Sequence, residues 1–211
     1  MLKRFALAAA PVLFLLTAAT PPPPDPLPAD EAEVEQTVRV AMETGLGTIV
    51  LELDEGRAPV TTANFLKYVD EKRFDGTEFY RVMRMPWGER AGLIQGGTQN
   101  APKRVLPPIA HEPTSQTGLS HTTGTISMAR YDPGTATGDF TIMTSNMTGL
   151  DADEASNNLG FAAFGQVVEG MDVVNAIYDV PLSQTKGVGV MKGQMIEDPV
   201  EIVSVRRIEA E

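Results

Sequence analysis

Cysteine is absent from this 211-residue sequence, and histidine occurs only twice. The lack of cysteine excludes disulfide bridges, iron–sulfur clusters, thiolate metal sites and thiol nucleophiles. His111 and His121 do not have the i, i+4 spacing of two ligands on a metal-binding helix. We therefore expect a protein that works without a metal and without a cofactor.

Basic residues are also scarce, because 17 Lys and Arg face 28 Asp and Glu, for a net charge of −11. Such a charge repels phosphate backbones and anionic membranes, so nucleic acid is not an expected partner. The length suits one domain. With 19 glycines, 16 prolines and 42% hydrophobic residues, the composition is typical of a turn-rich globular chain rather than a helical bundle.

A long apolar run occurs at the N-terminus, where Lys3 and Arg4 precede the stretch from Phe5 to Ala19. This layout predicts a signal peptide over residues 1–19. A retained membrane anchor is the alternative, but the run contains Pro11 and is shorter than the ~20 residues of a membrane-spanning helix. We expect cleavage, no stable membrane insertion afterwards, and an exported, periplasmic protein.

Residues 20–35 contain four consecutive prolines, Pro21 to Pro24, followed by further prolines and acidic residues. Tandem prolines favour extended polyproline II, and acidic residues favour solvation, so this segment is interpreted as a linker. A ligand for a partner domain is the alternative interpretation. The remaining residues, 36–211, are predicted to form one domain, which we expect to be a monomer.

The body of the sequence contains many short apolar segments. Alternation over Val38–Met42 and again over Ile49–Leu53 predicts a β-hairpin. Helical spacing predicts amphipathic helices over Val60–Phe74 and Met171–Tyr178. Many strands with only two helices favour an antiparallel sandwich or barrel over a doubly wound sheet. Further strands are predicted at Glu78–Met83, Leu93–Gln95, Thr125–Met128, Phe140–Met143, Phe164–Val168 and Val200–Ile208.

A series of motifs, in order and at consistent spacing, resembles a cyclophilin from about Val38 to Arg207. The resemblance implies a mainly β fold, a closed eight-stranded antiparallel barrel with a helix at each end. It also implies peptidyl-prolyl cis–trans isomerase activity on proline-containing unfolded or extended polypeptides. The motifs are Gly47–Leu53, Ala58–Thr61, Asn64–Phe65, Phe74–Val82, Ile94–Gly97, Gly124–Arg130 and Phe164–Val174.

The reaction implied by this resemblance breaks no covalent bond. Amide resonance sets a barrier of ~18–20 kcal/mol, so the catalyst needs a pocket for the proline ring and a donor that weakens that resonance. In the family this donor is an arginine, and the matching residue is Arg81, which follows Tyr80 where the family usually has histidine. Gln95 matches the glutamine that holds substrate backbone and steadies the arginine.

Two positions of the site depart from the family pattern. Asp139 replaces a glutamine, and an ionised carboxylate can only accept hydrogen bonds. If Asp139 faces Arg81, it either orients the guanidinium or occupies it in competition with substrate. Thr141 replaces an aromatic ring of the proline pocket, a loss of apolar contact of ~1–2 kcal/mol.

A third departure lies before Gln95, where Gly92 replaces another pocket aromatic and Leu93 a methionine. The segment from Met83 to Gly92 is about six residues longer than usual and contains Trp87, the single tryptophan. We hypothesise that Trp87 folds over the pocket and replaces the missing rings. Anchoring of the longer loop to the barrel is the alternative.

Four other positions match substrate-contacting parts of the family: Ala129 and Arg130 along the peptide groove, Leu150 beside the pocket and Phe161 at its rim. Gly149 stands where many members carry a ring. His111 and His121 are interpreted as loop residues without a role, and Glu112 as a structural acid.

The leading function is isomerisation of X–Pro bonds in exported proteins during folding. The main alternative is a catalytically weak or inactive module that binds proline-containing peptides, favoured by the changes at Asp139, Thr141, Gly92 and Gly149. An envelope scaffold or chaperone that uses another surface is a third possibility. The presence of Arg81 and Gln95 favours the enzyme.

Overall fold

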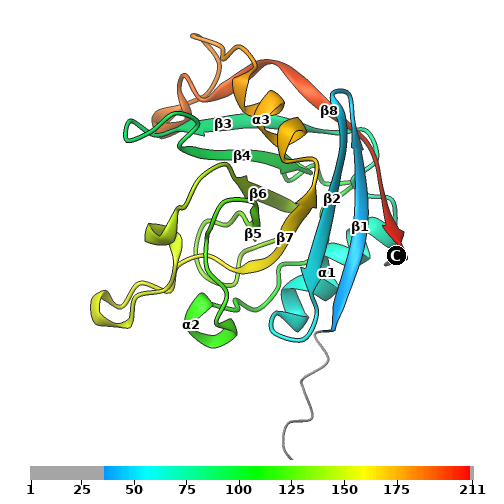
Figure 1. Ribbon diagram of the computed structural model, residues 1–211, viewed down its shortest axis with the longest axis vertical. Coiled ribbons are helices and arrows are strands. Elements are labelled where there is room, and N and C mark those ends of the chain that lie inside the picture. The colour runs from blue at the N-terminus through cyan, green and yellow to red at the C-terminus, as the bar shows by residue number, and fades with distance from the viewer. Residues whose placement is uncertain (1–35, 210–211) are drawn as a thin grey trace, which may run out of the picture. The chain divides into compact units, whose positions relative to one another are not determined.

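The computed structural model describes residues 36–209. Its strands form a closed barrel in the order β1-β2-β7-β5-β6-β4-β3-β8, and every pair is antiparallel. The predicted barrel is therefore confirmed (Figure 1). The predictions for residues 1–19 and 20–35, and the end of the predicted domain at residues 210–211, lie outside the described residues. The strands are β1 (Thr37–Thr44), β2 (Gly47–Asp54), β3 (Thr77–Arg84), β4 (Gly92–Gly97), β5 (Thr125–Met128), β6 (Asp139–Met143), β7 (Ala163–Glu169) and β8 (Met195–Ile208).

The two predicted helices are present as α1 (Pro59–Asp70) and α3 (Met171–Asp179), which lie at opposite ends of the barrel (Figure 1). A short third helix, α2 (Thr114–Thr117), was not predicted. Single 3-10 turns occur at Thr148–Leu150, Glu154–Ser156 and Gly189–Met191. Over residues 36–209, none of the helices has the length and apolar character required to cross a membrane.

Helix α1 ends four residues before the predicted end at Phe74. Lys72 adopts a left-handed φ of 53°, which cannot continue a right-handed helix. Phe74 nevertheless belongs to the core, with its ring 4.9 Å from that of Phe65. Its apolar character therefore marked a buried position in a turn, which periodicity alone does not distinguish from a helix.

Aromatic rings fill the interior of the barrel. Phe140 of β6 is completely buried and makes edge-on contacts with Phe65, Phe74 and Phe79 at ring distances of 5.5, 5.6 and 5.7 Å. Such edge-on pairs are the preferred geometry for aromatic rings and add to the stabilisation from burial. This core holds the strands that carry the site on their outer face.

Glu112 caps the N-terminus of α1 from another part of the chain. Its carboxylate accepts hydrogen bonds from the backbone N–H groups of Val60 and Thr61 at 3.0 and 2.7 Å, and from the Thr61 hydroxyl at 2.6 Å. The first N–H groups of a helix lack partners within the helix, and a negative charge also suits its dipole. The geometry agrees with a structural role for Glu112.

Candidate active site

A pocket lies on the outer face of the neighbouring strands β3, β4, β6 and β5. Because side chains alternate across a strand, Ile94 and Phe140 point into the core, whereas Gln95, Asp139 and Thr141 point toward the pocket. The cavity has a volume of about 380 Å³. Within residues 36–209, no group of three or more His, Asp or Glu side chains could hold a metal ion.

Nine residues singled out in the sequence come together in this pocket, and one does not. Those that line the cavity are Arg81, Leu93, Gln95, Ala129, Arg130, Asp139, Thr141, Leu150 and Phe161; Trp87 does not line it. Lining residues that sequence reasoning did not place in the site are Tyr80, Met83, Gln99, Asn100, Ser127, Tyr131, Thr135, Thr137 and Met191. Tyr80 and Ser127 lie within two of the sequence motifs, whereas the others belong to no motif and reach the pocket through the fold.

A bulge in β3 places two consecutive residues on the pocket side. The register with β4 shifts between Phe79 and Arg81, and the register with β8 shifts at the same place. Phe79 and Val82 both lie in the core, while Tyr80 and Arg81 between them both line the pocket. A bulge is a known way to re-aim a side chain next to an active site.

The guanidinium of Arg81 is held along two edges. Its Nη1 donates to Oε1 of Gln95 at 2.7 Å, whereas Nε and Nη2 both donate to Oε1 of Gln194, at 2.8 and 2.6 Å. Nη2 also lies 3.9 Å from the sulfur of Met83. Burial lowers the pKa of Arg81, but arginine stays protonated in proteins. Sequence reasoning missed Gln194, which is 113 positions away from Arg81.

The amide nitrogen of Gln95 is bound by Tyr80. The amide Nε2 of Gln95 donates to the hydroxyl of Tyr80 at 2.7 Å. Tyr80 and Asp139 are two positions at which the sequence departs from the family pattern. Both line the pocket, and the Tyr80 hydroxyl opposes the rise in the pKa of Asp139.

Both sequence hypotheses assumed that Asp139 acts directly on Arg81, but the Asp139 carboxylate binds elsewhere. Its Oδ1 accepts a hydrogen bond from the backbone N–H of Gln99 at 2.7 Å, so the carboxylate fixes the loop after β4. Burial raises the pKa of Asp139 above its usual value, and the hydrogen bonds from Gln99, Asn100 and Tyr80 oppose that increase. Gln99 and Asn100 both have left-handed φ angles, so this acceptor stabilises an unusual turn.

Thioether and leucine side chains form the apolar wall of the pocket. Met83, Leu93 and Leu150 line the cavity and pack in a small cluster with the buried Met143 and Met147. Methionine adapts its shape to irregular gaps. Thr141 makes the floor more polar, since its hydroxyl donates to the carbonyl of Ser127 at 3.3 Å.

Arg130 stacks on Phe161 at the opposite rim. Its guanidinium carbon lies 4.6 Å from the ring centroid, and its N–H groups donate to the carbonyls of Tyr131 and Gly160. Burial lowers the pKa of Arg130. Its side chain thus fixes the rim by binding the backbone.

His121, which the sequence suggested to be a loop residue without a role, is part of a buried hydrogen-bond network. It is completely buried; its Nδ1 lies 2.5 Å from Oδ1 of Asp151 and its Nε2 lies 2.8 Å from the Ser127 hydroxyl. Burial lowers the pKa of His121 although Asp151 opposes this, so the ring is neutral at pH 7. A carboxylate only accepts, so Nδ1 carries the proton and Nε2 accepts from Ser127. This network supports β5 beneath the pocket.

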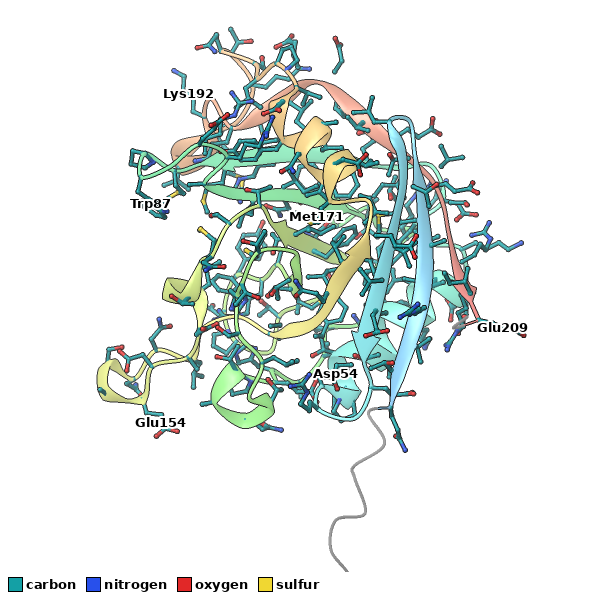
Figure 2. All side chains as sticks on the ribbon, in the orientation of Figure 1. Asp54, Trp87, Glu154, Met171, Lys192 and Glu209 are labelled. Carbon is teal, nitrogen blue, oxygen red and sulfur yellow. The ribbon has the colours of Figure 1, made fainter. Side chains whose placement is uncertain are left out.

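The structure places Trp87 away from the pocket, contrary to our hypothesis. Its side chain is 63% exposed, and Figure 2 shows it at the outer end of the loop between β3 and β4. That loop is fixed to α3 instead: Arg90 pairs with Asp179 at 2.7 Å, and the Tyr178 hydroxyl donates to the carbonyl of Ala91 at 2.9 Å. The direction of the loop therefore follows contacts with α3.

The amino-acid sequence of this chain is also similar to the sequences of known proteins. A family model described as cyclophilin type peptidyl-prolyl cis-trans isomerase/CLD matches residues 39–207. A peptidyl-prolyl cis-trans isomerase of Acinetobacter baylyi is 38% identical over 171 residues, covering 79% of this chain and 84% of that protein. Peptidyl-prolyl cis-trans isomerase B of Escherichia coli is 34% identical, covering 80% of this chain and 97% of that protein.

Among solved structures, a cyclophilin type peptidyl-prolyl cis-trans isomerase of Cryptosporidium parvum, determined in the presence of the dipeptide Ala-Pro, has a TM-score of 0.64. It is 20% identical and covers 82% of this chain and 99% of its own, and it supports the fold. With a match over nearly the whole described barrel, the chain belongs to the family of cyclophilin-type peptidyl-prolyl cis–trans isomerases.

Proposed function

We propose that this isomerase accelerates the isomerisation of X–Pro bonds in exported proteins while they fold, with Arg81 as its catalytic residue. One observation carries the assignment of Arg81. Three of the five N–H groups of the guanidinium are bound by Gln95 and Gln194, and a fourth lies by the sulfur of Met83. One N–H on Nη1 is left over for a substrate in the pocket.

The mechanism follows from amide resonance. The barrier of ~18–20 kcal/mol exists because the prolyl nitrogen shares its lone pair with the carbonyl. A charged N–H directed at that nitrogen draws the lone pair out of resonance and lowers the barrier. Arg81 does this without transferring a proton, because its guanidinium stays charged. Met83, Leu93 and Leu150 offer the apolar surface for the proline ring.

The substrates are proline-containing polypeptides in an unfolded or extended state. Cyclophilins bind proline-containing peptides, and the cavity here is open on the outer face of the barrel between Arg81 and Phe161. Ala129, Arg130 and Gln95 line the cavity and provide polar groups for a peptide backbone. The expected monomer presents one such site per molecule, which light scattering on the purified protein tests.

Export is supported by the sequence of residues 1–19, with Lys3 and Arg4 ahead of an apolar run. In this proposal the mature protein begins near residue 20, carries the linker over residues 20–35, and works in the periplasm. Cell fractionation followed by N-terminal sequencing tests this assignment. Recovery of a chain that keeps residues 1–19, or that stays in the cytoplasm, would contradict it.

Isomerisation of a short X–Pro peptide, followed without protease by NMR exchange, tests the activity. We expect the purified protein to accelerate exchange and Arg81→Ala to abolish most of the acceleration. Arg39→Ala is the matched control, because Arg39 pairs with Glu52 on the barrel at 2.8 Å and does not line the pocket. Equal loss in both variants would remove Arg81 from the mechanism.

A second candidate is a module that binds proline-containing peptides with little catalysis. It is favoured by Thr141, whose hydroxyl is used by the Ser127 carbonyl where an aromatic ring would supply apolar surface. In the same experiment this function predicts line broadening or shifts of the peptide on binding, without faster exchange. Activity in wild type that disappears in Arg81→Ala excludes it.

A further inference from the structure

The segment that leads into β8 brings one polar side chain to Arg81. The backbone N–H of Val82 donates to the carbonyl of Gln194 at 2.9 Å, directly before Met195, the cross-strand partner of Arg81. The N–H of Gln194 donates to the carbonyl of Met191 at 3.0 Å, which closes a turn. Gly193 in this turn has a φ of 76°, a conformation that favours glycine.

The contact between Gln194 and Arg81 has the geometry of a clamp. A single oxygen, Oε1 of Gln194, accepts from both Nε and Nη2, at 2.8 and 2.6 Å. Both lone pairs of the amide oxygen are thereby used, and the two N–H groups lie on one edge of a rigid plane. Gln95 binds the other side of the same plane, at Nη1.

The two glutamines have different effects. If Gln95 were the sole partner, the guanidinium would be held only at Nη1 and could rotate about that single hydrogen bond. Gln194 holds the opposite edge at two points, so the plane can no longer turn. The orientation of the remaining N–H on Nη1, which is the one the proposed function uses, then depends on Gln194.

We propose that Gln194 is a positioning residue for catalysis, which fixes the plane of the Arg81 guanidinium in the pocket. This inference rests on the proposed function of Arg81. Gln194 does not itself line the cavity. It acts through Arg81, so its removal changes turnover rather than the binding of substrate.

Two substitutions separate the hydrogen bonds from the shape of the side chain. Gln194→Met keeps the length but removes the acceptor, and we expect kcat to fall about ten- to hundredfold with KM changed by less than about twofold. Gln194→Glu keeps an acceptor at the same place, and we expect it to recover most of the lost kcat. Gln184→Met, an exposed glutamine in the same segment, is the control and leaves both constants unchanged.

A double-mutant cycle shows whether the effect passes through Arg81. In an Arg81→Lys background, which lacks the fork that Gln194 binds, Gln194→Met is expected to change kcat less than about twofold. An equal loss in both backgrounds would mean a general structural effect and would overturn the proposal. So would an unchanged kcat in the single variant Gln194→Met.

The resonance of the Arg81 Nε–H in a 15N NMR spectrum provides a readout that is independent of activity. We expect a resolved, slowly exchanging signal in the wild type and in Gln194→Glu, and its loss in Gln194→Met with the backbone spectrum retained. A signal that persists in Gln194→Met contradicts the clamp. If wild type shows the signal but no isomerase activity, the proposed function fails while the clamp stands.

Discussion

Arg81 and Tyr80, which are adjacent in β3, are joined through the side chain of Gln95. Arg81 donates to the amide oxygen of Gln95, and the amide nitrogen of Gln95 donates to the Tyr80 hydroxyl. A guanidinium has no acceptor, so Arg81 sets the direction of both hydrogen bonds. The amide oxygen of Gln95 is thereby kept toward Arg81.

Removal of the Tyr80 hydroxyl is expected to lower the activity. In Tyr80→Phe the amide of Gln95 loses the partner that fixes its orientation, a loss of one hydrogen bond of about 0.5–1.5 kcal/mol. We expect kcat/KM to fall about two- to tenfold in the NMR exchange assay. Tyr131→Phe, at a pocket tyrosine that is 80% exposed, is the control and should have no effect.

A separate test is Asp139→Gln, which restores the residue type of the family. Because the Asp139 carboxylate accepts from the Gln99 N–H and so fixes the loop after β4, we expect turnover to fall. A clear rise would instead mean that the carboxylate competes with substrate.

The buried His121 makes the stability of the fold depend on pH. Burial lowers its pKa in the folded protein below the usual value of about 6.5. The unfolded chain therefore binds a proton at a pH at which the folded protein does not. The free energy of unfolding falls as the pH decreases from 7 through the pKa of the unfolded chain toward the lower pKa of the folded protein. Urea unfolding at several pH values measures the slope.

Asp151 adds to the same trend at lower pH. Although burial acts to raise its pKa, hydrogen bonds from Ser120 and His121 lower it overall, so its stabilising effect is lost only in strong acid. We expect His121→Gln to flatten the decline between pH 7 and 5. His111→Gln is the matched substitution at the other histidine; an equal flattening there would contradict the assignment to His121.

Gly92 and Gly149 stand where the family has aromatic rings, and a ring fits at Gly149 but not at Gly92. At Gly149 no atom lies within 4 Å of an added Cβ, whereas at Gly92 it would lie 1.9 Å from the carbonyl oxygen of Met83, at a φ of 147°. We expect Gly149→Trp to fold and to bind an Ala-Pro peptide about three- to tenfold more tightly, because the ring stands beside Leu150.

Gly92→Phe, by contrast, is expected to destabilise the protein by more than about 2 kcal/mol through backbone strain. Thermal unfolding measures this loss, and calorimetric titration measures the gain at Gly149. Gly45→Trp is the control for a ring at an equally open but remote turn. Tighter binding in Gly45→Trp would show that the effect is not specific to the pocket.

Trp87 is expected to be dispensable for catalysis. Because its side chain is 63% exposed, Trp87→Ala should change the free energy of unfolding by less than about 0.5 kcal/mol and leave activity unchanged. The fluorescence of wild type should likewise not respond to a proline peptide. Leu150→Ala, which does remove a pocket residue, is the positive control for weaker binding. A drop in peptide affinity in Trp87→Ala would mean that Trp87 contacts the substrate after all.

The strands and half of the pocket-lining residues could be predicted because each depends on local pattern. Alternation of apolar residues marks β1 and β2, and motifs of the family mark Arg81 and Gln95. The bulge at Tyr80 could not be predicted in this way, since it depends on two neighbouring strands whose registers shift at the same place.

Contacts between distant segments account for what the sequence did not reveal. Gln194 stands 113 positions from Arg81 and belongs to no motif, and the direction of the Trp87 loop depends on an ion pair between Arg90 and Asp179. His121 looked like a loop residue because its segment is irregular, yet the fold covers it completely. Irregular backbone and burial are independent properties.

The pairing of β8 with both β1 and β3 determines when the barrel can close during synthesis. Until the ribosome has made all 14 residues of β8, both neighbours carry an open edge and the aromatic interior cannot be sealed. The barrel therefore cannot close before the whole of β8 has been synthesised.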